Sequence, residues 1–102
     1  MSAPLTEKEF SKHVNTKFRV AIDPPAELDL TDVKGYLSRE HEETGMERFS
    51  LFFRGPGDRY LRKQIYPLEH EQMGAFELFL VPVSQDQDGY RYEAVFNYYK
   101  QQ

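Results

Sequence analysis

Four apolar runs separated by turn residues dominate the second half of the chain. They are rich in aromatic and β-branched residues, and they span residues 49–53, 64–68, 76–83 and 90–98. Gly, Pro or Asp residues lie in each interval between them. Runs of this length, with turn signals at short spacing, are typical of antiparallel strands joined by hairpins. The pattern therefore predicts an antiparallel meander over residues 49–98.

A short helix is predicted near the N-terminus. Thr6 and Glu9 have the spacing of a capping box, in which the Thr6 hydroxyl accepts the Glu9 amide and the Glu9 carboxylate reaches back to Thr6. Leu5 and Phe10 occupy the two positions of a hydrophobic staple. We expect about two to three turns, ending at Asn15. Because so short a helix is marginal by itself, it must dock on the sheet, where it is expected to cover one open side.

The segment between this helix and the meander alternates between apolar and polar positions. Residues 18–22 read as a half-buried strand that ends at the Asp-Pro-Pro sequence of residues 23–25. A second alternating run over residues 28–37 predicts another strand, and the charged segment 38–47 is expected to be a surface loop. The fold class that follows is mainly β, a small antiparallel sheet or barrel of about six strands with one short N-terminal helix, forming a single domain over residues 1–102.

The strand over residues 76–83 is the expected centre of the sheet, because residues 78–83 are apolar on both faces. One set of side chains is expected to face the helix, namely Phe79, Val81 and Val83. The other set is expected to face the opposite side, namely Phe76, Leu78 and Leu80. The strand register therefore places the helix over the first set.

The composition limits the classes of function. The chain has 102 residues, no cysteine and a formal net charge of −4. The absence of cysteine excludes disulfides, thiolate metal sites and thiol catalysis. An acidic domain argues against nucleic-acid binding. There is no apolar signal-peptide core at the N-terminus and no run near the ~18 apolar residues of a membrane span. We therefore expect a soluble, cytoplasmic protein with neither nucleic acid nor a membrane as a partner.

No catalytic or cofactor motif is present. None of the serines stands in a Gly-x-Ser-x-Gly sequence, and residues 55–57 lack the pattern of a phosphate-binding loop. His13, His41 and His70 are far apart in the sequence and lack metal-ligand spacing. His70 stands between two glutamates, which are expected to raise its pKa at a surface hairpin. We predict that the chain is not an enzyme and has no catalytic residue, cofactor or metal ion.

One basic segment stands out in this acidic chain, and we call residues 54–63 the basic loop. It carries four cations and one aromatic residue: Arg54, Arg59, Tyr60, Arg62 and Lys63. Three interpretations are open. The loop can be solvated and paired with the acidic region 40–47 or with Glu69, it can contact an acidic protein partner, or it can contact a phosphate backbone. The net charge disfavours the last of these.

Four sequence motifs resemble a family of short bacterial proteins that is known only as a domain of unknown function. The motifs are FSLFFRGP (residues 49–56), YPLEH (66–70), FELFLVPV (76–83) and YEAVFN (92–97). The resemblance implies a bacterial or phage origin and a β-rich fold, and it points to phage-tail-like assemblies. Because the family has no assigned catalytic residues, it carries none over to this chain.

These observations lead to two hypotheses about function. The first is a non-enzymatic protein-interaction or assembly module of a bacterial, phage-tail-like complex, whose partner is another protein or a second copy of the chain. Self-association is expected through the terminal strand, an exposed edge with four tyrosines: Tyr90, Tyr92, Tyr98 and Tyr99. The alternative is a small barrel that binds an apolar or aromatic ligand between helix and sheet. A filled interior would argue against the alternative.

Overall fold

The structure is a computed structural model that describes residues 5–36 and 46–99. It contains one helix and six strands: α1 (Glu7–Ser11), β1 (Lys17–Val20), β2 (Ala26–Gly35), β3 (Met46–Gly55), β4 (Gln64–His70), β5 (Gly74–Asp86) and β6 (Gly89–Tyr99). All strand pairings are antiparallel. The predicted mainly β class, with about six strands and one short N-terminal helix, is therefore confirmed. No helix in the described part of the chain is long and apolar enough to cross a membrane.

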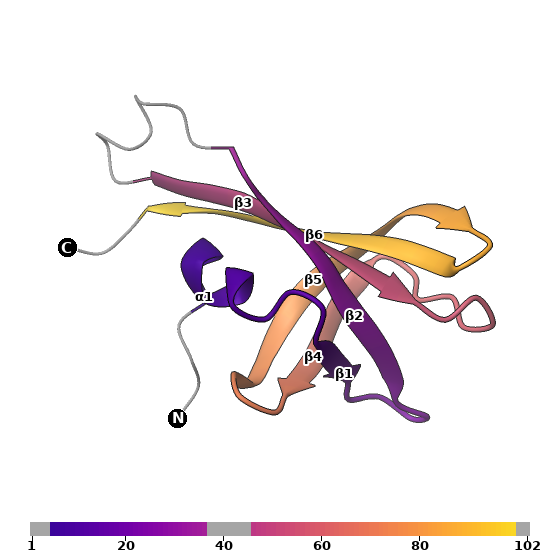
Figure 1. The fold of residues 1–102 in the computed structure, drawn as a ribbon. Coiled ribbons are helices and arrows are strands. Elements are labelled where there is room, and N and C mark those ends of the chain that lie inside the picture. The colour runs from indigo at the N-terminus through magenta and orange to yellow at the C-terminus, as the bar shows by residue number, and fades with distance from the viewer. Residues whose placement is uncertain (1–4, 37–45, 100–102) are drawn as a thin grey trace.

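The six strands form a closed ring in the order β1-β2-β3-β6-β5-β4 (Figure 1). The short strand β1 closes it, because β1 pairs with β2 on one side and with β4 on the other. Strand β6 lies between β3 and β5, and its backbone pairs with both. The prediction that the terminal strand is an exposed edge is therefore wrong for residues 90–93, which pair with a strand on each side. From Ala94 to Tyr99 the register pairs β6 with β3 alone.

Helix α1 begins as the capping motif predicts. The Glu9 amide donates to the Thr6 hydroxyl at 3.1 Å, which satisfies one of the free donors of the first turn. The Glu9 carboxylate does not return to Thr6, because it accepts from Lys12 at 3.2 Å and lies 3.3 Å from the His13 ring. Asn15 has a φ of 71°, a left-handed conformation that asparagine tolerates, and the chain then turns into β1. The helix therefore has one side-chain cap and an abrupt end.

Aromatic side chains pack together inside the ring around the helix residue Phe10. Phe10 is fully buried, and its ring centroid lies 5.7 to 6.3 Å from those of four other phenylalanines: Phe18, Phe49, Phe76 and Phe96. Offset and edge-to-face arrangements at these separations add to the free energy that burial of apolar area supplies. Apolar side chains of four strands, β1, β3, β5 and β6, therefore meet the helix through one side chain.

The orientation predicted for β5 is wrong. Leu80 is fully buried and Leu78 is 3% exposed, whereas Phe79 and Val83 are about half exposed, at 49% and 48%. Phe76 packs against Phe10 of the helix at 5.8 Å. A run that is apolar on both faces does not reveal which face is inside, and we assigned the wrong one. One face of β5 points into the ring, and the helix packs against that inward face.

The register also contains an irregularity at a proline. The pairing of β5 with β6 shifts between Pro82 and Ser84. Proline has no amide hydrogen to donate to a ladder, so a bulge at this position is the expected outcome. The shift falls close to the turn between β5 and β6, which contributes to the site described below.

Truncation of Leu80 tests the corrected orientation of β5. Leu80→Ala is expected to lower the free energy of unfolding by about 2–5 kcal/mol, because it removes a fully buried side chain and leaves a cavity. Phe79→Ala, the neighbour that points outward, is the matched control and should lower stability by about 1 kcal/mol or less, the worth of its cross-strand pair with Ile65. Urea unfolding of both variants measures the difference. Equal losses in the two variants would contradict the orientation.

Candidate functional site

The basic loop leaves the end of β3 and enters β4, at the end of the ring away from α1 (Figure 1). Tyr60 is 57% exposed, and Arg62 and Lys63, the last two residues before β4, are also exposed. The Tyr60 ring lies edge-on to the ring of Tyr90, with centroids 5.2 Å apart. The loop therefore exposes the ring of Tyr60, which packs against Tyr90 and has cationic residues next to it in the sequence.

Two buried tyrosines hold the loop from inside the ring. The Tyr92 hydroxyl accepts from the Leu61 amide at 2.9 Å and donates to the Arg59 carbonyl at 3.4 Å. The Tyr66 hydroxyl donates to the Arg62 carbonyl at 2.8 Å. Leu61 itself is buried, at 4% exposure. Burial raises the pKa of both tyrosines above the ordinary value of 10.0, so their hydroxyls stay protonated at neutral pH.

Two glycines allow the backbone at this end of the ring to pack closely. A Cβ atom at Gly55 would lie 2.8 Å from Leu28 and 3.1 Å from the ring of Tyr92. Gly89 has a φ of +131°, and a Cβ atom there would collide with the carbonyl oxygen of Gly55. The start of the basic loop therefore lies against the β5–β6 turn, in an arrangement that side chains at these two positions would prevent.

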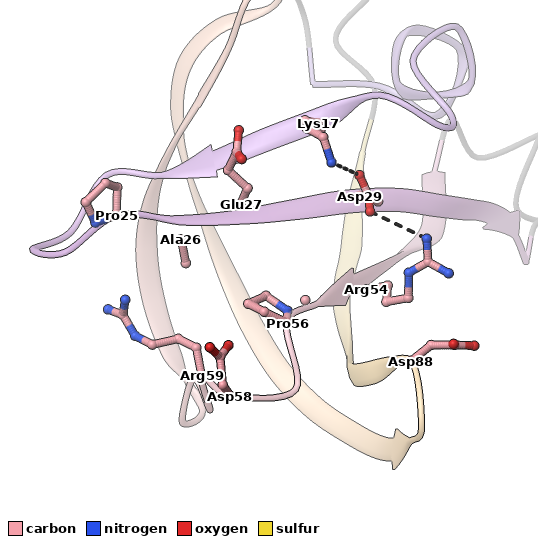
Figure 2. Close-up of a pocket in the computed structure, with 11 residues that line it drawn as sticks. Lys17, Pro25, Ala26, Glu27, Asp29, Arg54, Pro56, Asp58, Arg59 and Asp88 are labelled. Atoms are coloured by element: carbon pink, nitrogen blue, oxygen red, sulfur yellow. Dashed lines mark hydrogen bonds and ion pairs between the residues drawn. The ribbon is translucent and has the colours of Figure 1, made fainter.

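A hollow of about 490 Å³ opens beside the loop (Figure 2). Its charged residues are Lys17, Glu27, Asp29, Arg54, Asp58, Arg59 and Asp88. Asp29 lies 3.0 Å from the Lys17 ammonium and 3.5 Å from the Arg54 guanidinium, and Figure 2 shows it between the two cations. With three cations and four carboxylates in its lining, the hollow has no excess of positive charge to attract phosphate.

The cations of the basic loop separate into two groups. Arg54 is paired with Asp29. The other three, namely Arg59, Arg62 and Lys63, form no ion pair with a carboxylate among the side chains that the structure describes, those of residues 5–36 and 48–97. The Arg62 guanidinium donates instead to the neutral side chain of Gln64 at 2.9 Å.

Neither of the two acidic groups expected to pair with the basic loop is seen to do so. Glu69 is 2.8 Å from the guanidinium of Arg19, so the expected pairing of Glu69 with the basic loop is wrong. The side chains of the acidic region 40–47 lie outside the described residues. Neither acidic group therefore neutralises the charge of Arg59, Arg62 or Lys63 through an ion pair in the part of the chain that the structure describes.

An exposed apolar patch on the outside of β4 and β5 was missed in the sequence. Ile65 and Phe79 are cross-strand partners and are 60% and 49% exposed. Val83, on the same strand as Phe79, is 48% exposed. We call these three residues the outer patch. Lys63 is two residues before Ile65, so the patch begins where the basic loop ends. The sequence does not mark the patch, because Ile65 and Tyr66 are adjacent apolar residues. The burial of Tyr66 and Leu68 in the structure shows that Ile65, which alternates with them, points outward.

The histidines also differ from the prediction. His70 is 8% exposed rather than at the surface, and its pKa is lowered from 6.5, chiefly because burial disfavours the charged form. Its ring centroid lies 4.6 Å from that of His13, although the two are far apart in the sequence. His41 lies outside the described residues. No group of three or more His, Asp or Glu side chains within the described ranges is placed to hold a metal ion.

Comparison with known proteins agrees with the resemblance seen in the sequence motifs. A family model described as a domain of unknown function, DUF6916, matches residues 5–96. That range includes α1 and nearly all of the six strands. No curated protein and no solved structure matched the chain. The chain belongs to the family of the domain of unknown function DUF6916.

Proposed function

We propose that the chain is a non-enzymatic protein-interaction module whose contact surface combines the basic loop with the outer patch. The observation that carries the proposal is the set of unpaired cations beside Tyr60 in a chain of net charge −4. The partner is a protein surface that has acidic side chains next to an apolar anchor. Its place in a bacterial, phage-tail-like assembly is supported by the sequence resemblance alone.

The composition of this surface is that of an interface. Arginine and tyrosine are the residue types most enriched at binding hot spots, and the loop presents both at one end of the ring. The outer patch supplies the apolar area that forms the centre of protein contacts, and charged residues adjoin it as they do at an interface rim. Unpaired cations favour acidic partners and speed their association by electrostatic steering.

The loop is also prepared for binding before a partner arrives. Its backbone is held at residues 59, 61 and 62 by the two buried tyrosine hydroxyls, and the Leu61 side chain is anchored in the core. A loop that is already ordered loses less conformational entropy when it binds. The exposed side chains of Tyr60 and Arg62, and the partly buried side chain of Arg59, are therefore presented from a constrained backbone.

The alternative hypothesis, a ligand inside the ring, has less support. The phenylalanines around Phe10 occupy the space between helix and strands: Phe18 and Phe49 are fully buried, and Phe76 and Phe96 are partly buried. The hollow beside the basic loop is lined by charged side chains rather than by Phe or Tyr. Small closed β structures are usually filled by their own side chains, and this interior follows that rule.

Charge reversal of the loop tests the proposal. Arg59→Glu with Arg62→Glu should weaken binding of the partner at least about tenfold, because both attraction and hot-spot contacts are lost. The measurement is capture from the native host with mass spectrometry, followed by the dissociation constant of each identified partner with the purified variants. Lys8→Glu with Lys34→Glu is the matched control, since it changes the net charge equally at exposed positions outside the loop.

Both double variants should keep the fold, because the substituted side chains do not belong to the core. Wild-type binding should also weaken with salt, since exposed charges are screened over about 8 Å at physiological ionic strength. If the loop variant binds each partner as tightly as the control does, the cations are merely solvated and the proposal fails.

Removal of one hydroxyl tests the contribution of loop order. Tyr92→Phe leaves the Leu61 amide without its partner in a buried position, and it should cost about 1–3 kcal/mol of unfolding free energy. Hydrogen exchange over residues 57–63 should accelerate, and partner affinity should fall although no charge has changed. Tyr90→Phe is the control, because no hydrogen bond of its hydroxyl occurs among the described residues. Unchanged exchange in Tyr92→Phe would show that the loop is ordered by other contacts.

A further inference from the structure

The hydrogen bonds of His70 determine which ring nitrogen carries its proton. The Nδ1 atom accepts from the backbone amides of Gln72 and Met73, each at 3.1 Å. An atom that accepts cannot bear a hydrogen, so in the neutral ring the proton is on Nε2. Nε2 lies 2.9 Å from the Thr16 hydroxyl, to which it donates. The Thr16 hydroxyl in turn donates to the His13 carbonyl at 2.6 Å.

His70 therefore joins two parts of the chain that are 54 residues apart. Nδ1 organises the turn between β4 and β5, in which Met73 is fully buried. Nε2 holds the segment between α1 and β1 through Thr16. That segment is also tied to β2, because Asn15 donates to the Leu30 carbonyl at 2.7 Å and Leu30 donates to the Thr16 carbonyl at 3.1 Å.

The surroundings of His70 disfavour a second proton on the ring. Its ring lies between those of Phe18 and His13, with centroid separations of 4.3 Å and 4.6 Å. The charged and titratable groups near it come from α1 and the segment after it, from the start of β1, and from its own turn: Glu9, His13, Lys17 and Glu71. Glu71 favours the charged form, but burial and the adjacent His13 outweigh it and lower the pKa of His70.

A proton on Nδ1 would convert this acceptor into a donor that faces two amide donors. The three hydrogens cannot share one position, so the amides of Gln72 and Met73 would lose their partner and the turn would have to open. The helix on the other side has little stability of its own, since α1 has only five residues. It depends on the burial of Phe10 and on the contacts of the segment that follows it.

We propose that the His13–His70 contact is a proton-sensitive lock, which holds α1 and the β4–β5 turn against the ring when His70 is neutral and releases both in acid. Acid opening exposes the aromatic end of the core around Phe10. The lock does not depend on the proposed binding function, because the residues that form it lie outside the basic loop and the outer patch.

The direction of the pH dependence follows from the lowered pKa. The ring binds a proton more weakly in the closed state than in the open state, where its pKa is near 6.5. The contribution of His70 to closure is therefore fully present above pH 6.5, and it is lost as the pH falls from 6.5 through the closed-state pKa. Each pH unit between the two values changes the opening equilibrium up to about tenfold.

Hydrogen exchange of the full chain at pH 7.5 and 5.5, with times scaled for the intrinsic exchange rate, tests the lock. In the wild type, protection over residues 7–16 and 70–74 should fall roughly three- to tenfold at the lower pH, while β3 and β6 keep theirs. His70→Asn should remove most of this difference, because an asparagine oxygen can accept from the turn amides and does not titrate. In His13→Gln, the second variant, the difference in protection between the two pH values should persist but be smaller than in the wild type.

Equal protection of residues 7–16 in the wild type at the two pH values would overturn the proposal, as would an undiminished pH effect in His70→Asn. A measurement on the wild type alone covers the case in which His70→Asn does not fold. The ¹⁵N resonances of the His70 ring should titrate below pH 6.5. The amide resonances of Gln72 and Met73 should move with the same midpoint. Amides that stay fixed while the ring titrates would show that the proton does not open the turn.

Discussion

The insertion of Phe10 into the ring is the contact on which the rest of the fold depends. Six antiparallel strands close into a ring through β1, which pairs with β4 at only two register positions, Arg19 with Glu69 and Val20 with Leu68. So short a junction supplies few backbone hydrogen bonds, and side-chain packing must supply the remaining stability. Phe10 provides it by contacting Phe18 of β1 and Phe76 of β5 at once, on both sides of the region where the ring closes.

The opposite end of the ring is closed by different chemistry. There the basic loop folds inward at Leu61, and the hydroxyls of Tyr66 and Tyr92 satisfy the loop backbone from below. The loop is thus part of the core as well as part of the surface. This explains how an exposed, highly charged segment remains ordered. Its buried leucine and its tyrosine partners fix the backbone, while Arg59 and Arg62 remain outside without a carboxylate partner in the described chain.

Patterns among neighbouring residues predicted much of this architecture. The features that depend on contacts between distant parts of the chain were not predicted. The Thr6 cap and the alternation of β1 both follow from short-range chemistry that a few neighbouring residues determine. The orientation of β5 did not follow, because Phe79 and Leu80 are equally apolar and only ring closure decides which one is inside. The central position of β6 was missed for a similar reason, since strand order is not sequence order. In the candidate site, the cations and Tyr60 were identified from the sequence. The hydrogen bonds of Tyr66 and Tyr92 to the loop and the pairing of Ile65 with Phe79 were not, because they join residues from different elements.

The two ends of the ring differ in how they respond to pH, and this difference follows from the groups that close them. At the end of the basic loop the supporting hydroxyls belong to tyrosines whose pKa values burial raises, so acid leaves their hydrogen bonds intact. At the helix end the joining group is His70, whose pKa burial lowers and whose Nδ1 must remain an acceptor. Mild acid therefore acts on the hydrogen bonds of His70 and leaves those of the two tyrosine hydroxyls intact. A core that opened at the helix end would still hold the basic loop through Tyr92 and Leu61, so the binding surface and the proton-sensitive end can respond independently although both are built on one set of strands.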